Sequence, residues 1–350
     1  MIYDLIIIGG GQSALACAYF LRRTGLRYLI LDDQEAPGGA WQHAWDSLTL
    51  FSPSDHSSLP GWLMPKSEQP FPTRSEVIDY LTQYEQRYQP PIRRPVRVER
   101  VNQSGEHFVL QTSQETYQTR AVISATGTWQ KPFVPEVEGR KEFKSIQLHS
   151  SAYRNATPFE GKKVLVVGEG NTGAQILAEV SLVADTVWAT REEPKFLPDN
   201  VDGRVLFDVA SAKYFAEKEG RKYKPEKFSL GNIVMVPPVK EARERGVLHA
   251  VPTFKALDAD GVIWQDGSHG DFDVIIWCTG FRYALDHLAS LGVVTAEGRM
   301  PTQGTRATNC PGLWLVGYGN WTGFASATLI GVGRSARATV KEVEAYLRES

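Results

Sequence analysis

A strand, a glycine-rich turn and a helix follow one another twice in this chain, and this repetition constrains the fold more than any other feature. The first copy spans 4–14 (DLIIIGGGQSA) and the second spans 163–173 (KVLVVGEGNTG). Each begins with an uninterrupted aliphatic run, which is typical of a strand buried on both faces of a parallel sheet. Helical patterns follow at 13–23 and 172–182, and further strands at 28–31 and 186–189. The pattern predicts an α/β protein with two Rossmann-like dinucleotide-binding domains.

The remaining strands indicate that the second domain is inserted into the first. Two apolar runs end in Thr-Gly, at 121–127 and 273–280, and a last strand at 313–317 leads into a helix over about 326–348. A length of 350 residues suits two domains of ordinary size. We expect residues 1–156 and 279–350 to form the first domain and residues 157–278 to form the inserted one.

The glycines of the first turn have the spacing that lets a helix N-terminus bind a pyrophosphate. A helix N-terminus offers unpaired N–H groups and a partial positive charge. In this pattern Gly9 makes the tight turn, Gly11 lets the backbone approach the phosphates, and Ala14 lets the helix pack closely on the strand. Asp32 ends the next strand, where an acid accepts hydrogen bonds from the adenosine ribose. We therefore expect a dinucleotide at this turn.

The second turn has the complete pattern, with glycine at 168, 170 and 173. Arg191 follows the next strand, where an acid would select NAD, and a guanidinium there can form a forked pair with the 2′-phosphate of NADP. Hydrogen bonds to charged groups contribute about 1.5–3 kcal/mol. The adjacent Glu192 can instead repel the phosphate or accept from the ribose of NADH. We expect both NADPH and NADH to bind, with a modest preference for NADPH, and an ordinary surface role for Arg191 stays open.

Composition and charge argue against several classes of partner. The net charge of −2 gives no electrostatic reason to expect nucleic acid or an anionic membrane. No apolar stretch approaches the ~18 residues that span a bilayer, and the N-terminus lacks the features of a signal peptide, so we expect a cytoplasmic protein. Cys17, Cys278 and Cys310 form no Cys-x-x-Cys, and the histidines show no metal-ligand spacing. We therefore expect neither a dithiol centre nor a metal site.

Over nearly its whole length, the chain resembles the flavin-containing monooxygenases, in particular their short bacterial members. Beyond the two glycine-rich turns, the resemblance rests on the segments 38–41 (GGAW), 125–127 (ATG) and 279–281 (TGF). Phe143, His149 and Tyr153 also match a family signature, in which Ser145 replaces the usual glycine. The resemblance implies FAD in the first domain and NADPH or NADH in the second.

The resemblance also assigns individual residues to the two cofactors. Those that it places at FAD are Gly9, Gly11, Gln12, Ser13, Asp32, Gly39, Trp41, Thr126, Gly127, Gly317, Gly319 and Asn320. Those that it places at NAD(P)H are Gly168, Gly170, Asn171, Thr172, Gly173, Arg191, Glu192, Thr279 and Gly280. Asn320 and Phe51 are the positions expected beside the reactive flavin. Phe51 stands where larger relatives carry an asparagine, so it can exclude water but cannot donate a hydrogen bond there, and a role as an ordinary core aromatic stays open.

The activity that the resemblance implies is an NAD(P)H-driven monooxygenation. Reduced nicotinamide gives a hydride to FAD, and reduced FAD forms a flavin hydroperoxide with dioxygen. Its distal oxygen passes to a small soft nucleophile such as an organic sulfide, or a ketone reacts in a Baeyer–Villiger sense. Two alternatives stay open: an NAD(P)H oxidase that releases hydrogen peroxide, which Phe51 favours, and a non-catalytic flavin redox sensor. A disulfide reductase is not expected, because it needs a neighbouring cysteine pair.

The expected partners follow from this activity. They are a small-molecule substrate and dioxygen, without nucleic acid or membrane. A homodimer is the default expectation for the assembly.

Overall fold

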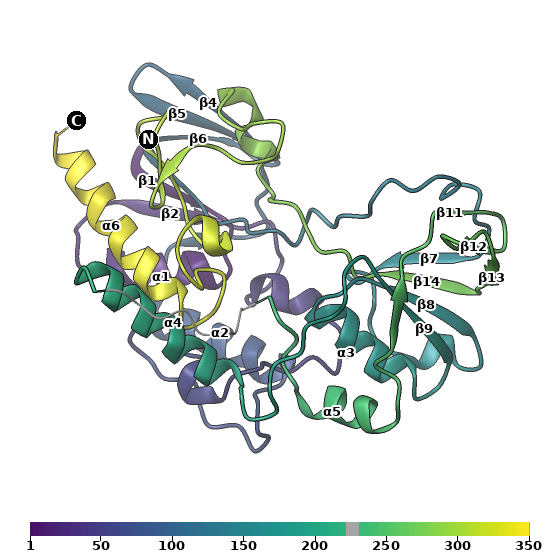
Figure 1. Ribbon diagram of the computed structural model, residues 1–350. Coiled ribbons are helices and arrows are strands. Elements are labelled where there is room, and N and C mark those ends of the chain that lie inside the picture. Colours follow the sequence, from purple (N-terminus) through teal and green to yellow (C-terminus); the bar gives the residue numbers. More distant parts are fainter. Residues whose placement is uncertain (222–230, 350) are drawn as a thin grey trace. The chain divides into compact units, whose positions relative to one another are not determined.

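The computed structural model describes residues 1–221 and 231–349, and these residues form two compact units. Unit 1 comprises Met1–Gln42, Pro53–Lys131 and Arg282–Ser350, and unit 2 comprises His43–Ser52 and Pro132–Phe281. Each unit contains a sheet with a parallel core and helices beside it (Figure 1). The predicted α/β fold, with one Rossmann-type domain inserted into another, is confirmed.

Unit 1 is built on a sheet whose central strands are parallel. The strand order is β15-β16-β17-β6-β1-β2-β3, and a β4-β5 hairpin extends from β6. The strands are β1 (Ile2–Ile8), β2 (Tyr28–Leu31), β3 (Ile92–Arg93), β4 (Val98–Ser104), β5 (His107–Thr112), β6 (Thr116–Ser124), β15 (Thr302–Gln303), β16 (Arg306–Ala307) and β17 (Leu313–Leu315). β1 lies between β2 and β6 and is parallel to both. Leu5, Ile6 and Ile7 are fully buried, which explains the absence of polar alternation in this run.

Three helices accompany the sheet of unit 1. They are α1 (Gln12–Leu21), α2 (Arg74–Tyr88) and α6 (Val332–Glu349), and the short 3-10 turns are η1 (Gly39–His43), η2 (Ser54–His56), η4 (Asp286–Leu291) and η5 (Gly319–Trp321). α2 begins with a capping box, in which Thr73 accepts from the N–H of Glu76 and the Glu76 carboxylate accepts from the N–H of Thr73. α1 and α6 contact each other (Figure 1). Ile6 and Ile8 of β1 belong to a core cluster that also contains Phe108 of the β4-β5 hairpin.

The last helix begins later than the sequence predicts. The pattern indicates a helix from about 326, whereas α6 begins at Val332. Ala325 has a positive φ of 53°, and a Cβ on Gly331 would lie 2.1 Å from the carbonyl oxygen of Ala325. The chain therefore turns back closely on itself before regular helical geometry can start.

Unit 2 is built on a fully parallel sheet of order β10-β9-β8-β14-β7. Its strands are β7 (Ile146–His149), β8 (Lys163–Val167), β9 (Asp185–Thr190), β10 (Ala250–Pro252) and β14 (Val274–Trp277). A small antiparallel sheet contains β11 (Ala256–Leu257), β12 (Gly261–Ile263) and β13 (His269–Asp271), and the helices are η3 (Thr157–Phe159), α3 (Asn171–Val180), α4 (Gly203–Lys218) and α5 (Pro237–Glu244). α3 contacts β8, β9 and α5 (Figure 1). Leu257 and Val262 of the small sheet share a core cluster with Leu165 of β8.

The boundaries between the two units along the sequence differ from the predicted boundaries of 156 and 278. β7 pairs with β14, with Ile146 opposite Val274, so the chain just before 156 contributes to the sheet of unit 2. The segment His43–Ser52 also belongs to unit 2, where the N–H of Asp46 donates to the carbonyl of Arg154 (2.9 Å). A strand as short as β7 gives too weak a pattern in the sequence to be assigned to one sheet or the other.

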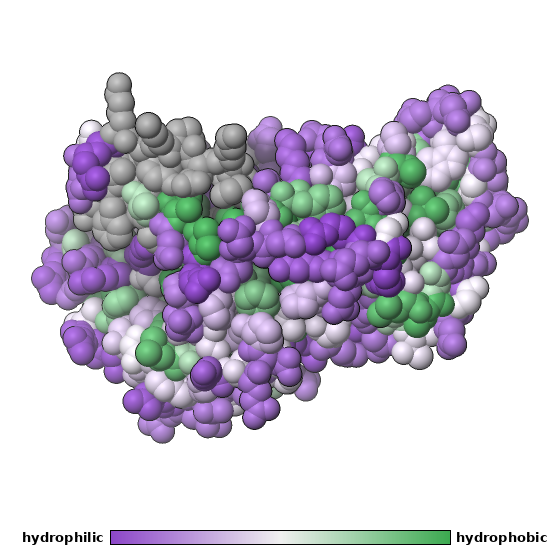
Figure 2. Space-filling view, turned by 60° about the horizontal axis from the view of Figure 1, so that its bottom comes forward, coloured by the Kyte–Doolittle hydropathy of each residue, from purple (hydrophilic) through white to green (hydrophobic). Residues whose placement is uncertain are grey.

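On the face shown in Figure 2, hydrophilic side chains predominate and hydrophobic areas lie between them. No helix in the described part of the chain is long and apolar enough to cross a bilayer. Within the same residues, no group of three or more His, Cys, Asp or Glu side chains could hold a metal ion. The cytoplasmic location and the homodimer stay predictions.

Candidate functional site

The first glycine-rich turn joins β1 to α1 and lies closely against the end of β6. Gly9 has a φ of +97°, and a Cβ there would lie 2.8 Å from the carbonyl oxygen of Ala125. The N–H of Gly9 donates to the carbonyl of Leu31 at the end of β2 (2.8 Å). The fold itself therefore requires glycine at this position, because a side chain would be strained and would collide with backbone.

Gly11, two residues later, is not required by the fold. It is the N-cap of α1, with φ −80° and ψ −169°, a conformation open to any residue. The nearest atom to a Cβ on Gly11 would be the Cα of Gly39, at an ordinary distance of 3.7 Å. A side chain would thus occupy open space beside a helix N-terminus, where anions bind. Gly11 leaves this space vacant, which fits the approach of a phosphate to the backbone.

The segment after β2 places Gly39 and Trp41 against the same turn. Gly39 has a φ of +54°, and a Cβ there would lie 2.8 Å from the Cα of Gly11. Trp41 donates from Nε1 to Oε1 of Gln12 (3.1 Å), and Gln12 donates from Nε2 to the carbonyl of Ala327 (2.8 Å). Four residues that the sequence predicts at FAD therefore lie together at the N-terminus of α1.

Asp32 also lies beside this turn, but its main partner is an arginine that no sequence pattern indicates. Arg94 donates from Nε to Oδ2 of Asp32 (2.6 Å), and its guanidinium also pairs with both carboxylate oxygens of Glu85 (2.6 and 2.9 Å). A Cβ on Gly10 would lie 2.3 Å from Oδ2 of Asp32, so the carboxylate rests directly on the turn. Burial raises the pKa of Asp32 above its ordinary value, and the hydrogen bond from Arg94 limits that rise.

The end of β17 meets the N-terminus of α1. Gly317 has a φ of +91°, and a Cβ there would lie only 2.0 Å from Oγ of Ser13. Ser13 and Gly317 are thus neighbours, although they come from opposite ends of the chain. η5 follows directly, with Gly319 at a φ of +66° and the exposed Asn320 after it.

A buried network of hydroxyl groups joins the end of β6 to the residues after β17. The hydroxyl of Tyr318 lies 2.6 Å from Oγ of Ser124 and 2.8 Å from Oγ1 of Thr126. Oγ of Ser124 also lies 3.1 Å from Nε2 of His287. Burial lowers the pKa of His287 to about 4, so the ring is neutral at pH 7. The network positions Thr126 and the adjacent Gly127, and no sequence pattern predicts its other three members.

The second glycine-rich turn, between β8 and α3, is held in the same way as the first. Gly168 has a φ of +131°, and a Cβ there would lie 2.3 Å from the carbonyl oxygen of Cys278. A Cβ on Gly173 would lie 2.3 Å from the carbonyl oxygen of Gly168, so this glycine permits close packing of helix and strand. Trp188, which no motif of the sequence singles out, donates from Nε1 to that same carbonyl (2.8 Å).

Gly170 is the open position of the second turn. It is the N-cap of α3 with φ −94° and ψ −177°, and a Cβ there would meet no atom within 4 Å. The next residue, Asn171, has a structural role, because Oδ1 accepts from the N–H of Val234 (2.8 Å) and Nδ2 donates to the carbonyl of Asn232 (3.1 Å). Thr172 follows, half-buried, in the first turn of α3. Asn171 therefore fastens the segment near 232–234 to the turn, whatever it also contributes to a ligand.

Arg191 lies just after β9 and faces a residue of the turn. Its side chain is 79% exposed, and Nη2 lies 3.7 Å from Oε1 of Glu169, the residue between the first two glycines. Glu192 is also exposed. Glu169 is absent from the predicted site residues, because the glycine pattern leaves this position unspecified.

The C-terminal ends of β14 and β7 are linked through His149. Its Nε2 lies 2.9 Å from the carbonyl of Gly280, and this acceptor requires the proton to be on Nε2. Nδ1 accepts from the N–H of Ser151 (3.1 Å). Burial lowers the pKa of His149, which favours this neutral form. Thr279 donates from its hydroxyl to the carbonyl of Phe133, and Gly280 has a φ of +79°.

Phe51 packs against the beginning of α4 within unit 2. Its ring centroid lies 5.9 Å from that of Phe207, and its carbonyl accepts from the N–H of Gly203 (2.7 Å). A Cβ on Gly203 would lie 2.6 Å from Cδ2 of Phe51. The contact explains the glycine at 203, while the place of Phe51 beside a flavin stays a prediction.

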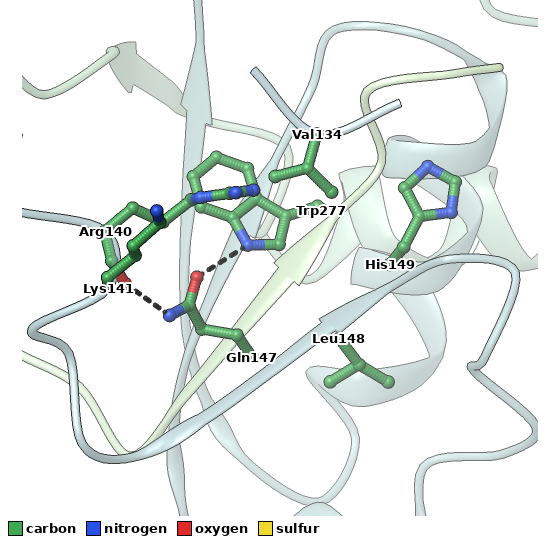
Figure 3. Close-up of a pocket in the computed structure, with 7 residues that line it drawn as sticks. All are labelled: Val134, Arg140, Lys141, Gln147, Leu148, His149 and Trp277. Atoms are coloured by element: carbon green, nitrogen blue, oxygen red, sulfur yellow. Dashed lines mark hydrogen bonds between the residues drawn. The ribbon is translucent and has the colours of Figure 1, made fainter. Parts of the chain in front are cut away.

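A shallow pocket of about 320 Å³ lies beside β7 in unit 2 (Figure 3). Gln147 closes part of it by accepting from Nε1 of Trp277 (3.2 Å) and donating to the carbonyl of Arg140 (2.8 Å). His149 contributes to the lining, but neither glycine-rich turn does. The pocket is therefore separate from the two glycine-rich turns.

The three cysteines are not paired with one another. Cys17 and Cys310 belong to unit 1 and Cys278 to unit 2, and all three are buried free thiols. Burial raises the pKa of Cys17 to about 12 and raises that of the other two as well. Buried thiols with raised pKa values are the opposite of the reactive cysteines that exchange electrons with a flavin.

Two Rossmann-type units, each with an open glycine-rich turn, define the class of oxidoreductases that bind two dinucleotides. The family model that matches the chain is described as pyridine nucleotide-disulphide oxidoreductase, and it covers residues 6–202.

Individual relatives narrow this class. The structure of a flavin-containing monooxygenase from Stenotrophomonas maltophilia is 51% identical, with a TM-score of 0.91, and the match covers 99% of each chain. An uncharacterized oxidoreductase, CzcO, from Bacillus subtilis is 30% identical over 97% of this chain and 99% of its own. The indole-3-pyruvate monooxygenase YUCCA4 of Oryza sativa is 26% identical over 98% of this chain and 88% of its own. The chain belongs to the flavin monooxygenase family and is an NAD(P)H-dependent flavin oxidoreductase, as the resemblance predicts. Membership implies that it uses FAD and NADP(H), with dioxygen and a small-molecule substrate.

Proposed function

We propose that unit 1 binds FAD, that unit 2 binds NADPH or NADH, and that the protein transfers oxygen to small soft nucleophiles such as organic sulfides. The observation that carries the proposal is the pair of open glycines, Gly11 and Gly170. Neither is needed for the conformation or packing of the chain. Each caps a helix that follows a buried parallel strand, which is where a pyrophosphate meets backbone N–H groups.

The chain's own part in the reaction is binding, orientation and exclusion of water. FAD, when bound, supplies the redox chemistry, since it accepts a hydride from reduced nicotinamide and activates dioxygen. Among the described residues, those assigned to the cofactors include no nucleophile or general base for this chemistry, and none is needed.

In unit 1, the N-terminus of α1 holds the pyrophosphate of FAD, with the backbone of Gln12 and Ser13 next to the open Gly11. Asp32 accepts from the adenosine ribose, and Arg94 fixes the orientation of its carboxylate through the 2.6 Å hydrogen bond. The side chain of Gln12 is fixed between Trp41 and Ala327. A cofactor that enters this site therefore meets groups that are already in position.

In unit 2, the N-terminus of α3 holds the pyrophosphate of the nicotinamide cofactor beside Gly170. Arg191, with its exposed guanidinium, pairs with the 2′-phosphate of NADPH. Glu169 and Glu192, which lie at the same end of the sheet, accept hydrogen bonds from the unphosphorylated ribose of NADH. This arrangement supports the proposal that both cofactors are used, with a modest preference for NADPH.

The balance between oxygen transfer and release of peroxide depends on what surrounds the reacting flavin. Phe51 provides an apolar wall that keeps water away, which favours oxygen transfer over release of peroxide. It donates no hydrogen bond, so part of the reducing equivalents is lost as hydrogen peroxide. An oxidase that makes only peroxide is the second candidate, and the same Phe51 is the observation that favours it.

Two glycine variants test the assignment of cofactors to units, and each serves as the control for the other. Gly11→Ala adds one methyl group to open space, so it should change the stability by at most about 1 kcal/mol. It should weaken FAD binding by about tenfold or more, which corresponds to about 1.4 kcal/mol, without affecting NADP⁺. Gly170→Ala should do the reverse. A Gly11→Ala protein that purifies with a full complement of flavin would contradict the assignment.

A further inference from the structure

Glu169 occupies the one position of the second turn that the glycine pattern leaves unspecified, and it faces Arg191. The register of the two preceding strands explains why these side chains lie close together. β8 and β9 are parallel, with Val167 paired to Ala189. Glu169 and Arg191 each lie two residues beyond this last pair, so they emerge side by side at the C-terminal end of the sheet.

The backbone around Glu169 is firmly held, while its side chain reaches solvent. The carbonyl of Gly168 accepts from the buried indole of Trp188 (2.8 Å). The N–H of Gly168 donates to the carbonyl of Ala189 (2.9 Å). The side chain of Glu169 is 37% exposed, and that of Arg191 is 79% exposed. Oε1 of Glu169 lies 3.7 Å from Nη2 of Arg191, so the carboxylate stands where an anionic group of a ligand would pair with this arginine.

We propose that Glu169 is a specificity-determining residue that competes with the 2′-phosphate of NADPH for Arg191. This inference rests on the proposed binding of NAD(P)H to unit 2. The 2′-phosphate must displace the carboxylate from Arg191 or remain close to it, and both alternatives weaken NADPH binding because the charges are alike. The ribose of NADH requires no displacement, and the carboxylate can accept from its hydroxyl groups. Glu169 thus reduces the preference for NADPH over NADH that Arg191 alone would produce.

The position of Glu169 distinguishes it from the other acids nearby. Glu192 and Glu193 follow Arg191 along the chain and are exposed, but Glu169 belongs to the turn that contacts the cofactor. A charge on the turn is fixed relative to the ribose, because the turn is anchored by β9 and by the helix that begins at Asn171. We therefore expect its removal to change the discrimination between the two cofactors and not merely the overall affinity.

The experiment measures binding without turnover. Dissociation constants for NADP⁺ and NAD⁺ are determined by calorimetry on the flavin-loaded protein and on Glu169→Gln, Arg191→Gln and the double variant. Glu169→Gln should strengthen NADP⁺ binding relative to NAD⁺ by about two- to fivefold, the size expected of one exposed charge interaction. In the Arg191→Gln background this effect should largely disappear. Glu160→Gln is the matched control, because it removes the same charge at the opposite end of β8 and should leave the ratio unchanged.

Three outcomes would overturn the inference. If Arg191→Gln weakens NADP⁺ selectively but Glu169→Gln leaves the ratio unchanged, Arg191 reads the 2′-phosphate and Glu169 does not modulate it. An equal effect of Glu169→Gln with and without Arg191 would exclude competition for the arginine. If Arg191→Gln changes neither constant, the proposed role of Arg191 in unit 2 fails, and the inference fails with it.

Discussion

The indole N–H of Trp188 donates to the carbonyl oxygen of Gly168 over 2.8 Å, from β9 to the turn that follows β8. Trp188 is 1% exposed, so this carbonyl is satisfied inside the protein and not by water. The N–H of Gly168 donates to Ala189 of the same strand. Both polar groups of the first glycine are therefore used to fix the peptide that precedes the open Gly170.

Replacement of Trp188 by phenylalanine should weaken both stability and cofactor binding. The variant keeps an aromatic ring but leaves the carbonyl of Gly168 without its donor, which costs about 1–3 kcal/mol when the group stays buried. The dissociation constant of NADP⁺ should rise about three- to tenfold, because the turn loses its fixed orientation. Trp277→Phe is the control, since its indole donates to Gln147 and not to the turn. A loss of stability with unchanged NADP⁺ binding would make the bond purely structural.

Removal of one partner of the Arg94–Asp32 ion pair should reduce the free energy of unfolding far more than removal of one partner of a surface pair. The side chains are 11% and 3% exposed, and removal of one partner of a buried pair destabilises by about 3–5 kcal/mol. We expect Arg94→Met to lower the free energy of unfolding by about 3 kcal/mol and to weaken FAD binding, because Asp32 loses its orientation. Arg97→Met removes an exposed arginine 3.6 Å from Asp33, and it should change stability by at most about 1 kcal/mol. Equal losses in the two variants would contradict the role of Arg94.

The neutral His287 should make the protein less stable in mild acid. Its pKa is lowered from 6.5 to about 4 by burial. Above pH 6.5 the ring is neutral in both the folded and the unfolded chain. As the pH falls from 6.5 to 4, only the unfolded chain gains the proton, so stability decreases, by up to about 3 kcal/mol. Below pH 4 the folded ring also protonates, and this contribution changes no further.

His287→Gln removes this titration and tests its size. Unfolding by urea is measured for both proteins at several pH values between about 7 and 4.5. The variant should lose less stability than the wild type over this range, because glutamine cannot be protonated. Parallel pH dependences would show that His287 titrates normally.

Phe51 provides a test of the coupling between NADPH oxidation and oxygen transfer. If it lines the flavin pocket, Phe51→Asn introduces a hydrogen-bond donor and should lower the fraction of NADPH that ends as hydrogen peroxide. Phe51→Leu is the control, since it also loses the ring contact with Phe207 but adds no donor. The same peroxide fraction in both variants would show that Phe51 does not line the flavin pocket.

The sequence predicts the parts of the fold and of the site that depend on local pattern. The two aliphatic runs and the glycine spacings predict both strand–turn–helix units, since each is complete within a short segment. The distinction between the glycines is not local. Gly9 and Gly168 are needed because Ala125 and Cys278 lie against them, and within the two glycine-rich turns only Gly11 and Gly170 are left open.

Contacts between distant parts of the chain could not be predicted from one sequence. Arg94 reaches Asp32 across 62 positions, and His287 reaches Ser124 across 163. Both pairings depend on the order of the strands in the sheet, which leaves no periodic signal. The late start of α6 has a similar cause, because the turn at Ala325 is imposed by close packing against Gly331.

Oxygen transfer to a sulfide can be followed with labelled dioxygen. The flavin-loaded protein is supplied with NADPH, methyl phenyl sulfide and ¹⁸O₂, and the sulfoxide is analysed by mass spectrometry while hydrogen peroxide is quantified in parallel. We expect sulfoxide that carries one ¹⁸O atom and accounts for most of the NADPH consumed. Hydrogen peroxide made from ¹⁸O₂ also carries the label and oxidises sulfides, so the sulfoxide is measured with catalase present and the peroxide in a parallel reaction without it. Recovery of all reducing equivalents as hydrogen peroxide without catalase, and no labelled sulfoxide with catalase, would contradict oxygen transfer and establish the oxidase.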